Sequence, residues 1–343
     1  MIQLLTYHDI DQQQWQALID RSPYATWFQT PEAYEFYTSV STELLPFALG
    51  IEEDGHLTGV IVGYTTQETN PIKQLLTCRS IIIGGPLLAE DISATALAAL
   101  LKAVAECPAS RLSPFASRLT NPIYIETRNF HDYSRWKSVF EANGYAYQPH
   151  LNFHVDTSSP EVVDQNLGKS RKRDIRTTIR DGVTPVYQPT IEQVRAYYDI
   201  LLDLYKTKVK TPLFCWEWFE QLYRCPDARF ILTELEGKIV GGTVCMELKG
   251  KALYEWFACG IDGVYPHIYP STYATYLGIK YAAENRCKIF DMMGAGKPEE
   301  TYGVRDFKAK FGGELVEHGR FLCVRKPLLY KLGKLGVKLL KKR

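Results

Sequence analysis

Residues 48–63 read ALGIEEDGHLTGVIVG, and residues 230–245 read FILTELEGKIVGGTVC. Each stretch is an apolar run, an acidic residue followed by glycine, and a second apolar run. The turn glycines, Gly55 and Gly237, take the same place, and another glycine follows four residues later in both. Glycine at a two-residue turn supplies the positive φ that a hairpin needs. Two unrelated hairpins are one interpretation, but the matched spacing favours a duplicated unit.

The sequence around each hairpin supports two copies of one domain. Helical patterns precede both hairpins, and after the second one a strand, a helix and another strand follow. The fold class expected is therefore α/β (α+β), with two tandem domains, each a mixed, mostly antiparallel sheet flanked by helices. The expected helices are 11–20, 31–38, 191–208, 216–223 and 270–285, and the expected later strands are 252–261 and 288–292.

The 343 residues suit two domains. The polar turn sequence at 156–160 marks a boundary. We expect an N-terminal domain over 1–155, a C-terminal domain over 156–325 and a basic tail over 326–343.

The charge balance excludes a general attraction to nucleic acid, because 40 basic and 39 acidic residues leave a net charge of +1. Any contact with tRNA or phosphate must come from a local patch. The eight cysteines form no C-x-x-C pair, which indicates buried thiols in a reducing compartment. No signal peptide or apolar run of membrane-spanning length is present, so the expected location is the cytoplasm.

The tail is basic and amphipathic. Residues 325–343 contain eight basic residues and no acidic one, and leucines recur along one helical face. One interpretation is a solvated end helix. The other is a peripheral contact with a membrane surface, because anionic lipid attracts such a helix.

A second basic cluster lies at 168–183, which reads GKSRKRDIRTTIRDGV. A helix here would bury one edge through Ile175 and Ile179 and end at Gly182. The basic residues either form a solvated face or bind phosphate or nucleic acid. The candidates for phosphate binding are Arg171, Lys172, Arg173 and Arg176.

The segment 289–294, IFDMMG, is followed by VRDFKAKFGG at 304–313. A lysine fixed between aromatic residues, here Lys308 after Phe307, can hold an oxyanion or a phosphate. His267 is the only histidine in a motif-like place. The sequence lacks G-x-S-x-G, H-E-x-x-H and G-x-x-x-x-G-K-[ST] motifs.

Together these elements resemble the Fem-type aminoacyltransferases and the neighbouring BioF2-like acetyltransferase domains of the GNAT superfamily. The resemblance rests on Ser22-Pro23-Tyr24 with Gln29, on the basic segment 169–180 before Gly182, and on Asp291–Gly294 followed by Phe307-Lys308 and Phe311-Gly312-Gly313. It covers about residues 15–325.

The resemblance implies two tandem GNAT-fold domains and peptide-bond formation. In the family, an amine attacks the ester of an aminoacyl-tRNA and an amino acid is added to a peptidoglycan precursor. No cofactor is implied, since aminoacyl-tRNA or acyl-CoA acts as the donor substrate. Lys308 maps to the lysine that steadies the carbonyl or the tRNA end. Residues Trp218, Tyr254, Trp256 and Tyr276, with His267 and Phe307 beside them, are the expected substrate-binding residues.

The sequence also departs from the family. Tyr37, Phe214, Trp218 and Phe257 stand where soluble members that use a nucleotide-linked muropeptide carry a Lys, an Arg and two Tyr. A nucleotide diphosphate would be held poorly without those cations. The loop 263–271 contains two prolines where GNAT enzymes bind the coenzyme A pyrophosphate through backbone N–H groups, which disfavours that donor.

Three hypotheses remain open. The first is an aminoacyl- or acyltransferase acting on an amine of a cell-envelope precursor, with a small-molecule or lipid-linked glycopeptide or glycan as acceptor. The second uses acyl-CoA or an acyl carrier protein to modify a surface polysaccharide or lipid. The third is a non-catalytic double-GNAT module that binds a glycan or a partner.

Overall fold

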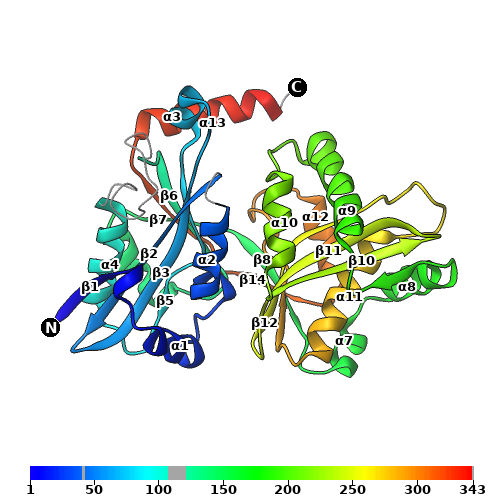
Figure 1. Cartoon of the computed structure of the whole chain (residues 1–343), viewed down its shortest axis with the longest axis horizontal. Coiled ribbons are helices and arrows are strands. Elements are labelled where there is room, and N and C mark those ends of the chain that lie inside the picture. The colour runs from blue at the N-terminus through cyan, green and yellow to red at the C-terminus, as the bar shows by residue number, and fades with distance from the viewer. Residues whose placement is uncertain (41–42, 107–120, 342–343) are drawn as a thin grey trace. The chain divides into compact units, whose positions relative to one another are not determined.

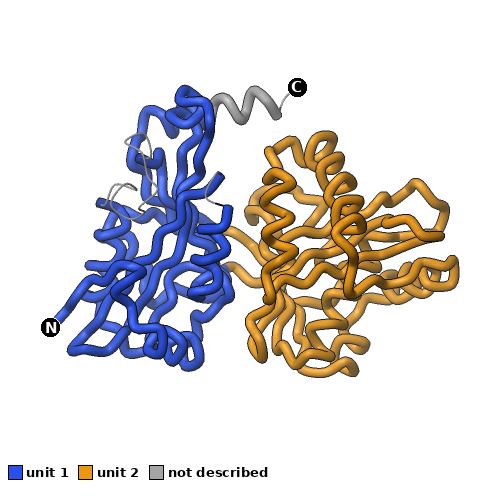
Figure 2. The backbone as a smooth tube through the Cα atoms, viewed as in Figure 1, with its two compact units in different colours: residues 1–149, 318–343 blue, residues 150–317 orange. Residues whose placement is uncertain are grey.

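The structure is a computed structural model that describes residues 1–40, 43–106 and 121–341, from residue 335 on by the backbone alone. The chain forms two compact units, 1–149 with 318–343 and 150–317 (Figure 2). The predicted α/β class with two mixed sheets is confirmed (Figure 1).

The first unit is built on a sheet in the order β1-β2-β3-β4-β6-β15-β7, with β5 paired to β3. Its one parallel pair among the described strands is β4 with β6. Its strands are β1 Ile2–Thr6, β2 Leu44–Glu53, β3 His56–Thr66, β4 Ser80–Gly84, β5 Leu87–Leu88, β6 Tyr124–Asn129, β7 Ala146–Gln148 and β15 Arg320–Val324. Its helices are α1 Gln12–Arg21, α2 Pro31–Ser39, α3 Pro71–Thr77, α4 Ala94–Glu106, α6 Lys137–Ala142 and α13 Pro327–Lys341, with short 3₁₀ turns at Tyr7–Asp9, Trp27–Gln29 and Ser134–Trp136.

The second unit has a sheet in the order β14-β8-β13-β12-β11-β10-β9. Its parallel pair among the described strands is β12 with β13. Its strands are β8 Leu151–Asp156, β9 Thr184–Val186, β10 Ala228–Leu235, β11 Lys238–Leu248, β12 Ala252–Gly260, β13 Ile289–Asp291 and β14 Glu314–Glu317. Its helices are α7 Pro160–Asn166, α8 Lys169–Arg180, α9 Ile191–Leu204 with a π-helical turn at Tyr205–Val209, α10 Trp216–Arg224, α11 Pro270–Glu284 and α12 Gly303–Ala309.

The two hairpins have the same backbone details. Both turns carry positive φ at two successive residues, Asp54-Gly55 and Glu236-Gly237, as a two-residue hairpin turn requires. Both also shift register once, after Ile51 in β2 and after Thr233 in β10. A shared bulge at the same distance from a shared turn supports the predicted duplication of one unit.

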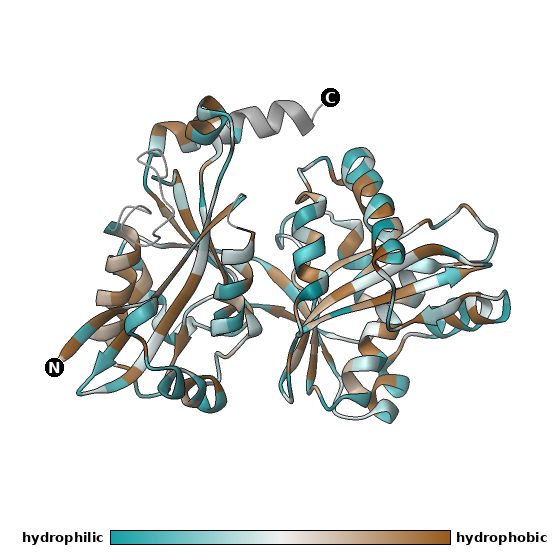
Figure 3. Cartoon of the chain, viewed as in Figure 1, coloured by the Kyte–Doolittle hydropathy of each residue, from teal (hydrophilic) through white to brown (hydrophobic). Residues whose placement is uncertain are grey.

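The cores follow from the sequence pattern. The sheet strands and α4 are largely hydrophobic (Figure 3). In α4 the buried residues include Leu97, Leu100, Leu101 and Val104, which lie on one helical face against β2 and β3. In the second unit, α11 packs on β10 to β13, while α9 and α10 lie on the other face of the sheet (Figure 1).

The units differ from the expected domain boundaries at two places. Strand β8, predicted as the end of the first domain, pairs with β13 and β14 in the second sheet. Strand β15, predicted as part of the second domain, lies between β6 and β7 in the first. The second unit thus begins before β8 instead of after it, and the first unit takes β15 from beyond the end of the second. No local sequence pattern indicates either.

The cysteines lie as predicted where they are described, since Cys78, Cys245, Cys259, Cys287 and Cys323 are buried and Cys215 and Cys225 are partly so. Cys107 lies outside the described residues. Among those residues, no helix combines the length and the apolar character that a membrane crossing needs.

Candidate active site in the second unit

The site begins where β12 and β13 stop pairing. Their parallel contact ends at Tyr254 and Asp291, although β12 continues to Gly260. On its other side β12 pairs with β11 throughout, and its register shifts so that Trp256 is an extra, bulged residue. Glu255, the first residue beyond the parallel pairing, is buried. Bulges re-aim side chains beside active sites, so this end of β12 is a place where chemistry can be positioned.

The backbone that follows β13 is held in an irregular path. Met293 and Gly294 both have positive φ, at 52° and 114°. The N–H of Met293 donates to Asp291 Oδ1 at 2.6 Å, and the N–H of Gly294 donates to Asn152 Oδ1 at 2.7 Å. The carbonyl groups of Met292 and Gly294 take no part in these two bonds and can accept from another donor.

Lys308 supplies that donor. It lies in α12, and its Nζ donates to the carbonyl oxygen of Gly294 at 2.8 Å and to that of Met292. Burial lowers the pKa of Lys308 below its ordinary value, while the charges of Glu255 and Asp291 act in the opposite direction. An ammonium group has three N–H donors, so two fixed carbonyl groups orient the third. Lys308 is therefore a cation held in one position beside the end of β12.

Glu255 lies in β12, and its charge acts on Lys308. Its Oε1 accepts from Thr275 Oγ1 at 2.9 Å and from Thr243 Oγ1 at 3.3 Å. Burial raises the pKa of Glu255, and Lys308 and the two hydroxyl groups oppose that rise. No role was assigned to Glu255 from the sequence, although a carboxylate inside the aromatic run Tyr254 to Phe257 is itself a signal, because unpaired buried charge is costly.

A buried pair lies on the other side of β13. His154 Nε2 is 3.0 Å from Asp291 Oδ2, and Asn152 Nδ2 donates to Asp291 Oδ1 at 2.8 Å. Burial favours a raised pKa for Asp291, but the hydrogen bond and charge of His154 outweigh it and hold that pKa below its usual range. The same pair raises the pKa of His154. Asp291 is thus an ionised anchor for the Met293–Gly294 path, and β8 provides both of its side-chain partners.

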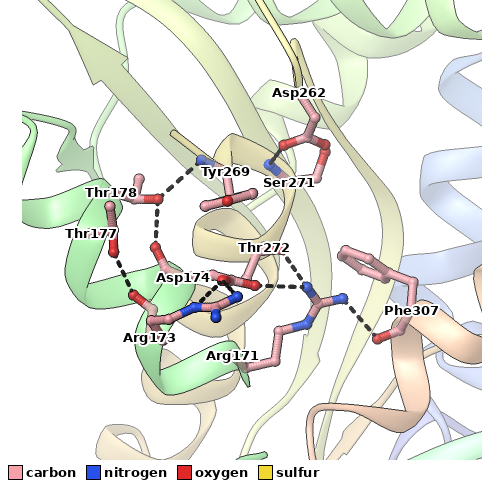
Figure 4. A network of polar contacts seen from close by, with 10 residues as sticks. All are labelled: Arg171, Arg173, Asp174, Thr177, Thr178, Asp262, Tyr269, Ser271, Thr272 and Phe307. Atoms are coloured by element: carbon pink, nitrogen blue, oxygen red, sulfur yellow. Dashed lines mark hydrogen bonds and ion pairs between the residues drawn. The ribbon is translucent and has the colours of Figure 1, made fainter. Parts of the chain in front are cut away.

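Arg171 joins three helices of the site (Figure 4). Its Nη1 donates to Thr272 Oγ1 on α11 at 2.9 Å, and its Nη2 donates to the carbonyl oxygen of Phe307 at 3.1 Å. Its guanidinium also lies over the ring of Phe307, 4.3 Å from the centroid. Arg171 is buried, so its charge serves to position α12, which carries Lys308, against α8 and α11.

The predicted helix of the basic segment is confirmed as α8. Arg173 and Arg176 are exposed, and Lys172 is partly buried with Nζ 3.6 Å from Asp164. The expected apolar edge is wrong at Ile179, which is 49% exposed. Thr178 is buried instead, because its Oγ1 bonds to the carbonyl oxygen of Asp174 and to the N–H of Tyr269.

The predicted aromatic residues fall into two groups. Trp218 lies against Trp256, with ring centroids 5.0 Å apart, and stacks on Phe214 at 4.6 Å. Tyr254 is buried in β12. Tyr276 lies on α11 and packs on the core that α11 forms with the sheet, so it does not join this cluster. Where the family resemblance places an Arg and two Tyr for the acceptor, this unit has a packed aromatic cluster of Phe214, Trp218 and Phe257.

His267 lies in the exposed loop before α11, with a positive φ of 63°. At the start of α11 two of the backbone N–H donors are already occupied, and a third residue has none. Pro270 has no N–H, the N–H of Ser271 lies 3.2 Å from Asp262 Oδ1, and that of Tyr269 bonds to Thr178 (Figure 4). A carboxylate here repels a pyrophosphate, so this helix start lacks the anion site that coenzyme A would need.

The first unit is closed at the corresponding place. Its β4 pairs with β6 along its whole length. The buried side chain of Gln29 donates to the carbonyl groups of Gly84 and Gly85, and Tyr133 donates to that of Gly84. The predicted N-terminal signature at Gln29 is thus part of a structural staple. Within the described ranges, no cluster of His, Cys, Asp and Glu side chains is arranged to hold a metal ion in either unit.

Comparisons with known proteins agree with this architecture. The model of the FemAB family matches residues 236–338. The crystal structure of FemX superposes with a TM-score of 0.71 at 14% identity, covering 96% of this chain and 99% of that one. No curated protein matches the sequence significantly.

Two further structures share the fold. The L-PGS of Bacillus licheniformis has a TM-score of 0.54 at 13% identity, covering 95% of this chain and 96% of that one. A tandem GNAT protein from the clavulanic acid biosynthesis pathway has 0.53 at 9% identity, covering 94% and 98%. The predicted tandem GNAT fold is confirmed. The resemblance to the Fem-type family is confirmed with it, in fold over the whole chain and in sequence over the part that carries Glu255 and Lys308.

Proposed function

We propose that this chain is an acyltransferase that joins an activated amino acid to an amine of a cell-envelope precursor. The observation that carries the proposal is Lys308, whose ammonium is fixed by two backbone carbonyl groups beside the end of β12. Amine attack on an ester carbonyl builds negative charge on the carbonyl oxygen. A fixed cation at that oxygen stabilises the transition state without reorganising.

The charges around Lys308 suit this role. Glu255 and Asp291 raise the pKa that burial lowers, which favours the protonated lysine. Glu255 is itself held by Thr243 and Thr275 and does not need to move to do so. In this proposal Lys308 contacts the reacting carbonyl, and Glu255 acts through Lys308.

The donor that fits best is an aminoacyl ester on tRNA. The occupied start of α11 speaks against a pyrophosphate at the usual coenzyme A position. Exposed bases on α8, Arg173 and Arg176 with Lys172 beside them, can meet phosphates of the donor.

The acceptor follows from the aromatic cluster. Phe214, Trp218 and Phe257 stand where the resemblance places an Arg and two Tyr for a nucleotide-linked acceptor, so the cation expected in this unit is absent from these positions. Trp218 and Phe257 are buried, whereas Phe214 and Trp256 are partly exposed. Exposed aromatic faces suit sugar rings and apolar groups, so we propose a lipid-linked glycopeptide or glycan in place of a nucleotide-linked one.

The test offers two donors separately to the purified chain, bulk tRNA charged with radiolabelled amino acids and acetyl-CoA, each with a lipid-linked muropeptide as acceptor. We expect label to pass from the charged tRNA to the acceptor amine and no acetyl transfer. Acetyl transfer alone would replace this proposal with an acyl-CoA-dependent N-acyltransferase. Absence of transfer from either donor, with the chain folded, would contradict it.

A further inference from the structure

The helix α3 presents its apolar residues to solvent. Its buried residue is Gln74, whereas Ile72, Leu75 and Leu76 are 71%, 47% and 50% exposed. The Gln74 side chain is satisfied inside, since its Oε1 accepts from the N–H of Glu68 and its Nε2 donates to the carbonyl of Thr66. A helix on a water-facing surface has the reverse arrangement. The exposed apolar face of α3 is therefore suited to binding an apolar surface.

The helix α13 lies against α3 in the same unit (Figure 1). Its start is anchored: Lys326 donates to the carbonyl of Asn121 at 2.8 Å, and the ring of Tyr330 meets that of Tyr124. One turn apart, Leu328 and Leu332 are 79% and 61% exposed. Figure 3 shows hydrophobic colour on α3 and at the start of α13. Together, Ile72, Leu75, Leu76, Leu328 and Leu332 are the α3–α13 surface.

The net charge beside this surface is positive. Lys331 and Lys334 are exposed on α13, and Lys73 is exposed on α3. Glu68, an acid near Lys73, is paired with it at 2.7 Å. The segment 325–343, which includes Lys331 and Lys334, has eight basic residues and no acid. Two copies meeting through this surface would oppose these positive charges, so a second copy is a poor occupant.

We propose that the α3–α13 surface docks on an anionic lipid bilayer. The five apolar side chains enter the headgroup region, and the lysines beside them bind lipid phosphates. A contiguous apolar surface beside clustered bases is the arrangement of a peripheral membrane helix. The docking does not depend on the reaction proposed above.

The test measures partition of the full chain onto sedimenting vesicles. We expect binding to vesicles of phosphatidylglycerol and phosphatidylcholine in equal parts, none to phosphatidylcholine alone, and weaker binding in high salt. The double variant Ile72→Ser/Leu75→Ser, which leaves the tail intact, should lower the partition coefficient at least roughly tenfold, because two apolar side chains no longer enter the bilayer.

The matched control is Leu315→Ser, a leucine of similar exposure, 48%, on β14 in the second unit. It should bind vesicles as the parent chain does. Since all three residues are exposed, each variant should keep the parent thermal transition. Parent-like binding by the α3 double variant, or no binding to anionic vesicles, would overturn the proposal. The proposal would also be overturned if the chain formed a dimer without lipid and the Leu328→Glu variant did not.

Discussion

Lys308 is the residue on which the proposed chemistry depends, and its protonation depends on its neighbours. Glu255 is the largest influence that raises the pKa of Lys308 against burial. If protonated Lys308 stabilises the oxyanion, activity is lost as pH rises through that pKa. Glu255 therefore acts as a positioning and charge-setting residue, and its effect is visible in a pH profile.

Replacing Glu255 by Gln keeps the shape and removes the charge. Burial then acts on Lys308 with only Asp291 opposing it, so the alkaline limb of kcat/KM should move to lower pH. Glu247→Gln is the control, because Glu247 is also buried but pairs with Arg229. An alkaline limb that stays in place in Glu255→Gln would show that Glu255 does not set the charge of Lys308.

Some residues of the candidate site could be predicted from the sequence, and others could not. Phe307-Lys308 stood out because a basic residue sits among aromatics. Glu255 did not, because its partners Thr243, Thr275 and Lys308 come from three other elements. Arg171 resembled its basic neighbours in sequence, and only the packing of α8 on α11 and α12 separates it from them.

At the scale of elements, α8 separates structural from exposed charge. Arg171 is turned inward, while Arg173 and Arg176 are exposed on the same helix. If the exposed bases bind donor phosphates, they act on donor affinity and leave the chemical step unchanged.

Replacing both Arg173 and Arg176 by Ala should raise KM for charged tRNA with kcat nearly unchanged. Each lost phosphate contact should also reduce the slope of log affinity against log salt by about 0.7 to 0.9. The control Lys249→Ala changes an exposed base in the turn after β11. An unchanged KM and salt slope in the double variant would remove α8 from donor binding.

The elements themselves were largely predictable. The hairpins, α8, α10 and α11 follow from turn glycines and apolar periodicity. The outward apolar face of α3 was not predicted, because its helical pattern does not reveal which face is buried. That depends on Gln74 finding partners at Thr66 and Glu68.

In the whole molecule, each sheet contains one strand that the expected domain boundaries placed in the other domain. Strand β8 lies between β13 and β14, and β15 lies between β6 and β7. Local patterns fix strands but not their partners, which is why the expected boundaries at 155 and 325 miss both strands.

This arrangement predicts which fragment folds alone. Residues 150–317 contain every strand of the second sheet and should give a cooperative thermal transition with dispersed amide resonances. Residues 157–325 lack β8, which supplies His154 and Asn152 to Asp291, and should not fold. A folded 157–325 fragment would show that β8 is dispensable.

The most direct test of the central claim is the single-turnover rate of aminoacyl transfer to the acceptor amine by Lys308→Met. The matched control is Lys310→Met, an exposed lysine two residues away. We predict that Lys308→Met keeps its fold and loses about 10²- to 10³-fold in rate, as for one oxyanion donor, while Lys310→Met transfers at the parent rate. A folded Lys308→Met chain that transfers as fast as the parent would show that Lys308 does not stabilise the oxyanion.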